Sequence, residues 1–217
     1  MRGKLLEKLG LVAVVALGVA VIAAPAQALP MFTAESYPAK LKGQALEPQI
    51  FKFNASWKCK QVSLLATLTE ASSTLNLAPE YSECTFFGLP VSAKTGGCRY
   101  ELHLKEAIKE DEYKATFDVL CPKGELIEFN FSIPGGFCRW KFGEQTALST
   151  VRVKNETTAE PAKDVILWLE ISNIKYTTEG NLAECGANGT FFSGMYQGVV
   201  TLPAFDASSK AEGLWVA

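Results

Sequence analysis

His103 is the only histidine in the 217-residue chain and the side chain best suited to acid–base chemistry. It lies between Leu102 and Leu104 and close to Glu101, where apolar and polar residues alternate. A histidine there could act as a general base or join a Ser-His-acid set. Because the chain has no Gly-x-Ser-x-Gly nucleophile motif, we interpret His103 as a solvated strand residue and expect no catalytic residue.

Acidic side chains cluster between Glu106 and Glu112, and acidic clusters outside the cell can bind calcium. This cluster lacks the spaced oxygen ligands of a calcium loop, so we interpret it as a solvated hairpin tip and expect no metal site. The two carboxylates of a glycoside hydrolase need to meet only in space, so a hydrolase of that kind stays an alternative. No motif indicates a bound cofactor, and we expect none.

Six cysteines are an even number, which in an exported chain predicts three disulfides. A zinc site is the competing interpretation, but the sequence has no Cys-x-x-Cys motif and no Cys/His cluster. The predicted disulfide residues are Cys59, Cys84, Cys98, Cys121, Cys138 and Cys185.

Strand alternation narrows the fifteen connectivities that six cysteines allow. Cys98 and Cys121 fall side by side at one end of a predicted hairpin, whereas Cys138 begins a strand at the opposite end, roughly 25 Å away at about 3.3 Å per residue. A disulfide cannot span that distance. We therefore favour Cys59 with Cys84, Cys98 with Cys121, and Cys138 with Cys185. The main alternative pairs Cys84 with Cys98.

Several aromatic residues are not accounted for by the apolar face that the strands define. An aromatic platform on a β-domain could hold a sugar or a partner protein, although such residues more often form the second layer of the core. The possible binding surface consists of Trp57, Phe86, Phe87, Tyr196 and Trp215.

The first 28 residues have the layout of a secretory signal peptide. Basic residues precede an apolar run from Leu9 to Ala24, and the small-residue triplet Ala26-Gln27-Ala28 follows. An uncleaved membrane anchor is the alternative. Cleavage after Ala28 would leave residues 29–217 as one secreted domain with no stable membrane insertion, and it would change the net charge from -2 to -4. This acidic balance gives no electrostatic reason to bind nucleic acid or an anionic membrane surface.

Apolar residues alternate strictly through four consecutive segments between Cys98 and Phe142. This is the period of strands with one buried face, and no stretch has a convincing helical period. The segments predict a four-strand meander within an antiparallel β-sandwich of the Ig-like or jelly-roll-like kind. An up-and-down β-barrel is the alternative architecture.

Turn positions set the expected register of these strands. Pairing Cys98 with Cys121 also places Leu102 opposite Phe117. The turn at Pro122-Lys123-Gly124 then pairs Val119 with Ile127, and the turn at Pro134-Gly135-Gly136 pairs Phe131 with Trp140. In a later strand the alternation slips by one near Ser172-Asn173, which predicts a β-bulge.

Five segments resemble parts of a group of uncharacterised secreted, cysteine-containing, all-β proteins from soil actinobacteria. They are 76–84 (NLAPEYSEC), 96–102 (GGCRYEL), 119–124 (VLCPKG), 148–155 (LSTVRVKN) and 173–178 (NIKYTT). The resemblance implies export and an all-β fold. The group has no assigned activity, so the resemblance transfers no active site.

These observations predict a non-enzymatic module that is extracellular or associated with the cell envelope. Its expected partner is a cell-wall glycan or an extracellular protein, bound through loops or an aromatic patch. A secreted hydrolase with paired carboxylates is the first alternative, and a barrel that binds a small apolar ligand is the second.

Overall fold

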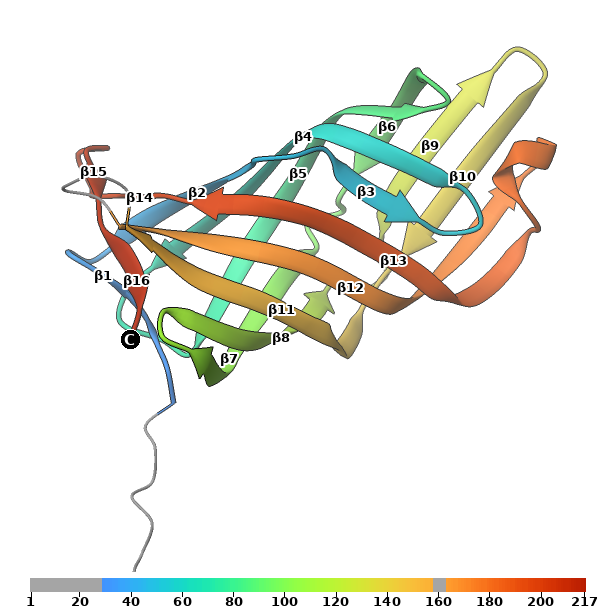
Figure 1. Ribbon diagram of the computed structural model, residues 1–217. Coiled ribbons are helices and arrows are strands. Elements are labelled where there is room, and N and C mark those ends of the chain that lie inside the picture. Colours follow the sequence, from blue (N-terminus) through green and yellow to red (C-terminus); the bar gives the residue numbers. More distant parts are fainter. Residues whose placement is uncertain (1–28, 158–162) are drawn as a thin grey trace, which may run out of the picture.

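Antiparallel strands make up most of the structure, as the alternation predicts, and the all-β class is confirmed. The computed structural model describes residues 29–157 and 163–217 (Figure 1); the predicted signal peptide, residues 1–28, lies outside the described residues. Helix within these ranges is limited to the 3-10 helix η1 (Ala183–Cys185). The strands are β1 (Phe32–Ala34), β2 (Ala39–Ala45), β3 (Gln49–Lys52), β4 (Ser56–Leu68), β5 (Thr74–Phe86), β6 (Leu89–Lys94), β7 (Arg99–Lys109), β8 (Glu112–Leu120), β9 (Ile127–Ile133), β10 (Gly136–Phe142), β11 (Gln145–Thr157), β12 (Lys163–Gly180), β13 (Gly189–Leu202), β14 (Ala204–Phe205), β15 (Ala211–Glu212) and β16 (Leu214–Val216).

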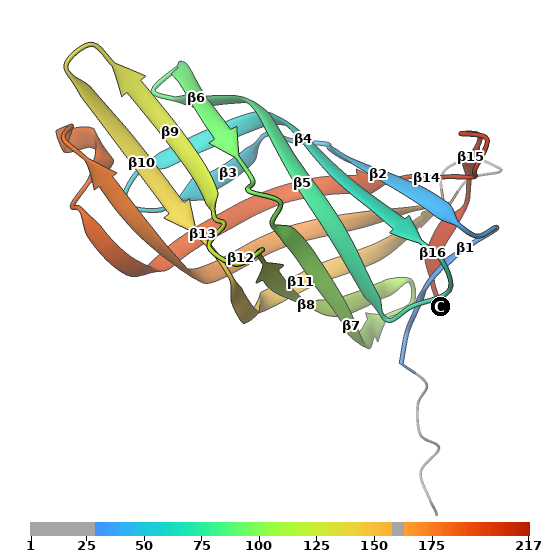
Figure 2. The same cartoon turned by 180° about the vertical axis from the view of Figure 1, so that it is seen from behind.

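The main sheet contains fourteen strands and closes on itself. One edge of β5 pairs with β4, and the other edge pairs first with β7 and then with β6. In the same way, one edge of β12 pairs first with β11 and then, further along the strand, with β10. Two branches, β7-β8-β11 and β6-β9-β10, therefore run from β5 to β12 (Figure 2). β13, β3, β2 and β4 complete the circuit.

The opposite walls of this closed sheet pack directly against each other. The ring centroids of Phe51 on β3 and Phe129 on β9 lie 4.7 Å apart, and those of Trp57 on β4 and Trp140 on β10 lie 4.5 Å apart. The architecture thus combines the closure of the barrel alternative with the two-layer packing of a sandwich. The protein's own aromatic rings fill the interior here, which weakens the hypothesis of a barrel that carries an apolar ligand.

The predicted pairings around the first two disulfides are confirmed. Leu102 is opposite Phe117, and Cys59 is opposite Cys84. The predicted β-bulge is also present, because the register of β12 and β13 shifts between Ile171 and Ile174, and Asn173 has a φ of 59°.

The four-strand meander is wrong, because β8 pairs with β11 and β9 pairs with β6. The chain makes two separate hairpins there, β7-β8 and β9-β10. Alternation gives every strand the same buried face, so it cannot show which strand lies beside which. The predicted register of the second hairpin is also displaced by two residues: Ile133 pairs with Gly136, so Trp140 lies opposite Phe129 rather than Phe131.

All three predicted disulfides are present, and the described residues contain no free cysteine. Cys59–Cys84 and Cys98–Cys121 each join neighbouring strands at the ends of long pairings, with Cα atoms 3.8 and 4.1 Å apart. Cys138–Cys185 ties η1 to the start of β10. The alternative pairing of Cys84 with Cys98 is excluded.

A small polar network is buried within the aromatic interior. The hydroxyl groups of Tyr81 and Tyr100 are hydrogen-bonded, and the Tyr196 hydroxyl donates to Gln49 Oε1 at 2.9 Å. The amide of Gln49 in turn donates to the carbonyl of Val199 at 3.2 Å. Burial is the main cause that raises the pKa of Tyr81, Tyr100 and Tyr196. The network satisfies polar atoms that would otherwise be costly to bury.

Replacing Phe51 should be severely destabilising, because its ring is fully buried and packs against rings from both walls. We expect Phe51→Ala to lower the free energy of unfolding by about 3–5 kcal/mol. Urea denaturation with the disulfides intact is the measurement. Leu65→Ala is the matched control, since Leu65 is 38% exposed and should cost less than about 1 kcal/mol. Equal losses in the two variants would contradict this account of the core.

The buried tyrosines should make the protein sensitive to alkali. Unfolded tyrosine ionises near its ordinary pKa of 10.0, whereas the folded state keeps Tyr81, Tyr100 and Tyr196 protonated to higher pH. The folded state therefore binds more protons above pH 10, so stability is complete below that pH and falls as pH rises. Tyrosinate absorbance should increase together with loss of near-ultraviolet circular dichroism. Full titration of every tyrosine in a protein that stays folded would contradict this.

Candidate functional site

His103, Glu101 and Asp118 meet on the outer face of the hairpin formed by β7 and β8. Strand alternation turns Leu102 inward, so that its neighbours Glu101 and His103 point outward. Cross-strand pairing places Asp118 opposite Glu101. The sequence indicated that His103 lies on the polar face beside Glu101, and the structure confirms this.

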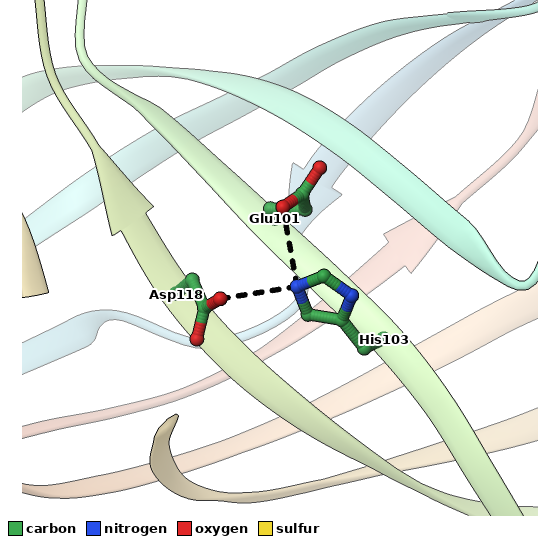
Figure 3. Close-up of side chains that lie close together, drawn as sticks. All are labelled: Glu101, His103 and Asp118. Carbon is green, nitrogen blue, oxygen red and sulfur yellow. Dashed lines mark hydrogen bonds and ion pairs between the residues drawn. The ribbon is translucent and has the colours of Figure 1, made fainter. Parts of the chain in front are cut away.

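Both carboxylates approach the same nitrogen of the imidazole (Figure 3). His103 Nε2 lies 3.1 Å from Asp118 Oδ2 and 3.2 Å from Glu101 Oε2. The three side chains are partly shielded, with exposed fractions of 27% for His103, 22% for Glu101 and 16% for Asp118. Together they bring one nitrogen and two carboxylate oxygens within 4.8 Å of one another at a partly exposed place on the surface.

The second oxygen of Asp118 is held by the backbone of β11. Asp118 Oδ1 accepts a hydrogen bond of 2.7 Å from the N–H of Ala147. Ala147 has a φ of 55° and lies where the β8–β11 register shifts between Gln145 and Leu148. The irregularity of β11 thus supplies an N–H that fixes the carboxylate and leaves Oδ2 facing His103. Sequence reasoning missed this contact, because Ala147 is far from Asp118 along the chain.

The acidic residues near the β7–β8 turn are arranged differently, because Glu106 on β7 and Glu112 on β8 pair with basic side chains. Glu106 Oε1 lies 2.9 Å from Lys114 Nζ, and this hydrogen bond lowers the pKa of the Glu106 carboxyl. Glu112 pairs with Lys109 at 2.9 Å and with Arg152 at 3.6 Å. These contacts are surface and interstrand ion pairs.

The predicted aromatic binding surface is largely wrong. Trp57, Phe86 and Tyr196 are at most 2% exposed and belong to the core, Trp215 is half-buried, and only Phe87 is fully exposed, at 77%. The physical reason is the closure of the sheet, which gives the interior two walls. Aromatic side chains from both walls fill this interior, so residues beyond the one predicted apolar face are buried.

Phe87 instead lies in the turn between β5 and β6. This turn is at the end of the molecule where the β5–β6 and β9–β10 hairpins project (Figure 1). We call Phe87, Leu89 and Ile133 the hairpin-end surface, and all three are exposed. On the antiparallel strands β6 and β9, Val91 pairs with Phe131. Leu89 and Ile133 lie two residues further toward the end of these strands, so they are on the same face as Val91 and Phe131. The Phe87 ring packs on Phe86 at 4.5 Å, which connects this surface to the core.

The fold and site together define an all-β, antiparallel protein with three disulfides. Comparison of the chain with models of protein families, with curated proteins and with solved structures found no match. Within residues 29–157 and 163–217, no helix has the length and apolar character needed to cross a membrane.

The hydrogen bond between Asp118 and Ala147 should contribute to the stability of the start of β11. We expect Asp118→Ala to lower the free energy of unfolding by about 1–2 kcal/mol, because the N–H loses its acceptor. Asp118→Asn should cost less, since the amide oxygen can still accept. Urea denaturation and hydrogen exchange at the Ala147 amide measure the effect. The variant His103→Gln is the control, because it removes the contact between Asp118 and the imidazole but leaves the hydrogen bond to Ala147. If hydrogen exchange at the Ala147 amide were unchanged in Asp118→Ala, the hydrogen bond would not have the predicted role.

Proposed function

We propose that this chain is a non-enzymatic extracellular or cell-envelope module that binds a protein or glycan through the hairpin-end surface. Three disulfides support a protein that works in an oxidising compartment. The packed aromatic interior argues against a ligand held within the core. The alternative of a secreted hydrolase stays a prediction, to be tested by activity screening.

One observation carries the proposal: Phe87 is 77% exposed in the turn between β5 and β6, and Leu89 on β6 and Ile133 on β9 are exposed as well. An apolar side chain in that position gains nothing from water, and rigid hydrophobic tips are typical anchors of interfaces. The disulfide Cys59–Cys84 lies close to this turn. In the β5–β6 hairpin, Phe86 and Leu89 form the last pair before the turn, and Cys84 and Val91 pair two residues further from it. The turn is therefore preorganised, which lowers the entropy cost of binding.

The chemistry of the hairpin-end surface favours a protein partner over a glycan. Phe87, Leu89 and Ile133 provide apolar area without a hydroxyl or amide group of their own. Sugar recognition needs hydrogen-bonding groups beside the aromatic ring, whereas a protein partner can bury aliphatic and aromatic side chains directly. The proposed partner is accordingly an envelope protein with an apolar recess.

Cosedimentation with cell envelopes of the producing organism tests this function. The oxidised protein should pellet with untreated envelopes, and Phe87→Ser should raise the apparent dissociation constant at least about tenfold, which corresponds to about 1.4 kcal/mol. Phe192→Ser is the matched control, because Phe192 is 65% exposed but lies on β13 beside Lys175. A reduced and alkylated sample shows whether the folded state is needed.

Pretreatment of the envelopes separates the two partner classes. Protease digestion should abolish binding if the partner is a protein, whereas binding to digested walls and purified insoluble polysaccharide would identify a glycan. If the oxidised protein stays in the supernatant, or if Phe87→Ser and Phe192→Ser pellet as the unmodified chain does, the hairpin-end surface is not the binding site.

A further inference from the structure

The arrangement around His103 leaves two carboxylates competing for one proton. Only one hydrogen can be bound to Nε2, yet Glu101 Oε2 and Asp118 Oδ2 both lie within 3.2 Å of that atom. At most one of them can accept a well-aligned hydrogen bond. Two carboxylate oxygens and one imidazole nitrogen therefore converge on a place where a cation, bound instead of the proton on Nε2, would satisfy all three groups.

The spacing of the three atoms fits a metal ion between them. In a tetrahedral zinc site with bonds of about 2.0–2.2 Å, neighbouring ligand atoms are roughly 3.3–3.6 Å apart. The two nitrogen–oxygen distances here are 3.1 and 3.2 Å, and all three atoms lie within 4.8 Å of one another. The two nitrogen–oxygen contacts would have to lengthen by about 0.1–0.5 Å to match this spacing.

Within the part of the chain that the structure describes, no lysine or arginine forms an ion pair with these carboxylates. Among the ion pairs between described residues, Glu101 and Asp118 contact only His103. The acidic residues elsewhere on this hairpin show the contrast, since Glu106 and Glu112 each have a basic partner. With a neutral imidazole the cluster has a charge of about -2, which a divalent cation would balance.

The outer contacts of Asp118 also match those of a metal ligand. Its Oδ1 is hydrogen-bonded to the Ala147 N–H, so the carboxylate is oriented while Oδ2 is left available. Such second contacts orient ligands and increase metal affinity. The remaining exposure of the three side chains leaves room for water to complete the coordination.

We propose that Glu101 Oε2, His103 Nε2 and Asp118 Oδ2 bind one divalent transition-metal ion, with zinc as the expected occupant. A single imidazole with two carboxylates suits zinc and its first-row neighbours, whereas calcium and magnesium prefer oxygen ligands alone. This site lies on the outer face of β7 and β8 and does not depend on the hairpin-end surface. It revises the expectation that the chain has no metal site.

Because His103 is the only histidine, its ring nitrogens can be observed selectively. The full oxidised chain, purified without a histidine tag and treated with chelator, is titrated with Zn²⁺ in a calorimeter and by nitrogen-15 NMR of the imidazole. We expect one zinc per chain and a shift of the Nε2 resonance on binding. His103→Gln and the double variant Glu101→Gln/Asp118→Asn should each weaken binding at least about tenfold.

Glu106→Gln is the matched control, because Glu106 is an exposed carboxylate of the same hairpin but pairs with Lys114. It should bind zinc as the unmodified chain does. Circular dichroism confirms that each variant is folded. The proposal is overturned if zinc leaves the Nε2 resonance unchanged, or if folded His103→Gln binds one zinc with unchanged affinity.

Discussion

The constraint on which the rest of the structure depends is that every long strand must satisfy both of its edges. β5 and β12 do so by changing partners along their length, β5 from β7 to β6 and β12 from β11 to β10. The sheet can then close over two different branches, and closure removes the unpaired edges that would otherwise invite aggregation. The separate hairpins β7-β8 and β9-β10 follow from this division.

Closure also determines what the interior must contain. Two walls face each other across one core, so aromatic side chains from both are needed to fill it, and Phe51 contacts Trp57 on its own wall and Phe129 on the other. The tyrosines of the buried network contribute hydrogen-bonded hydroxyl groups to this aromatic core. The disulfides add covalent ties between neighbouring strands at Cys59–Cys84 and Cys98–Cys121.

Because the interior is filled where the walls meet, both proposed binding features lie outside it. Within the hairpin-end surface, Leu89 and Ile133 extend the apolar faces of β6 and β9 beyond the point where a second wall covers them, which explains why they are exposed although Val91 and Phe131 are buried. The cluster at His103 uses the opposite, polar face of β7 and β8. Chemistry on this face depends on cross-strand pairing and on the irregular start of β11.

The sequence by itself determined the strands and their buried faces, because alternation is a local property of the chain. Together with the short turns, it also determined the pairings Cys59–Cys84 and Cys98–Cys121 and the outward orientation of His103. Only the tertiary structure decided that β8 lies beside β11, that Trp57 and Tyr196 are core residues, and that Asp118 joins Glu101 and His103 with its carboxylate held by Ala147. These outcomes depend on which strands meet across the closed sheet. Every strand shows the same alternation, so the pattern contains no information about its neighbours.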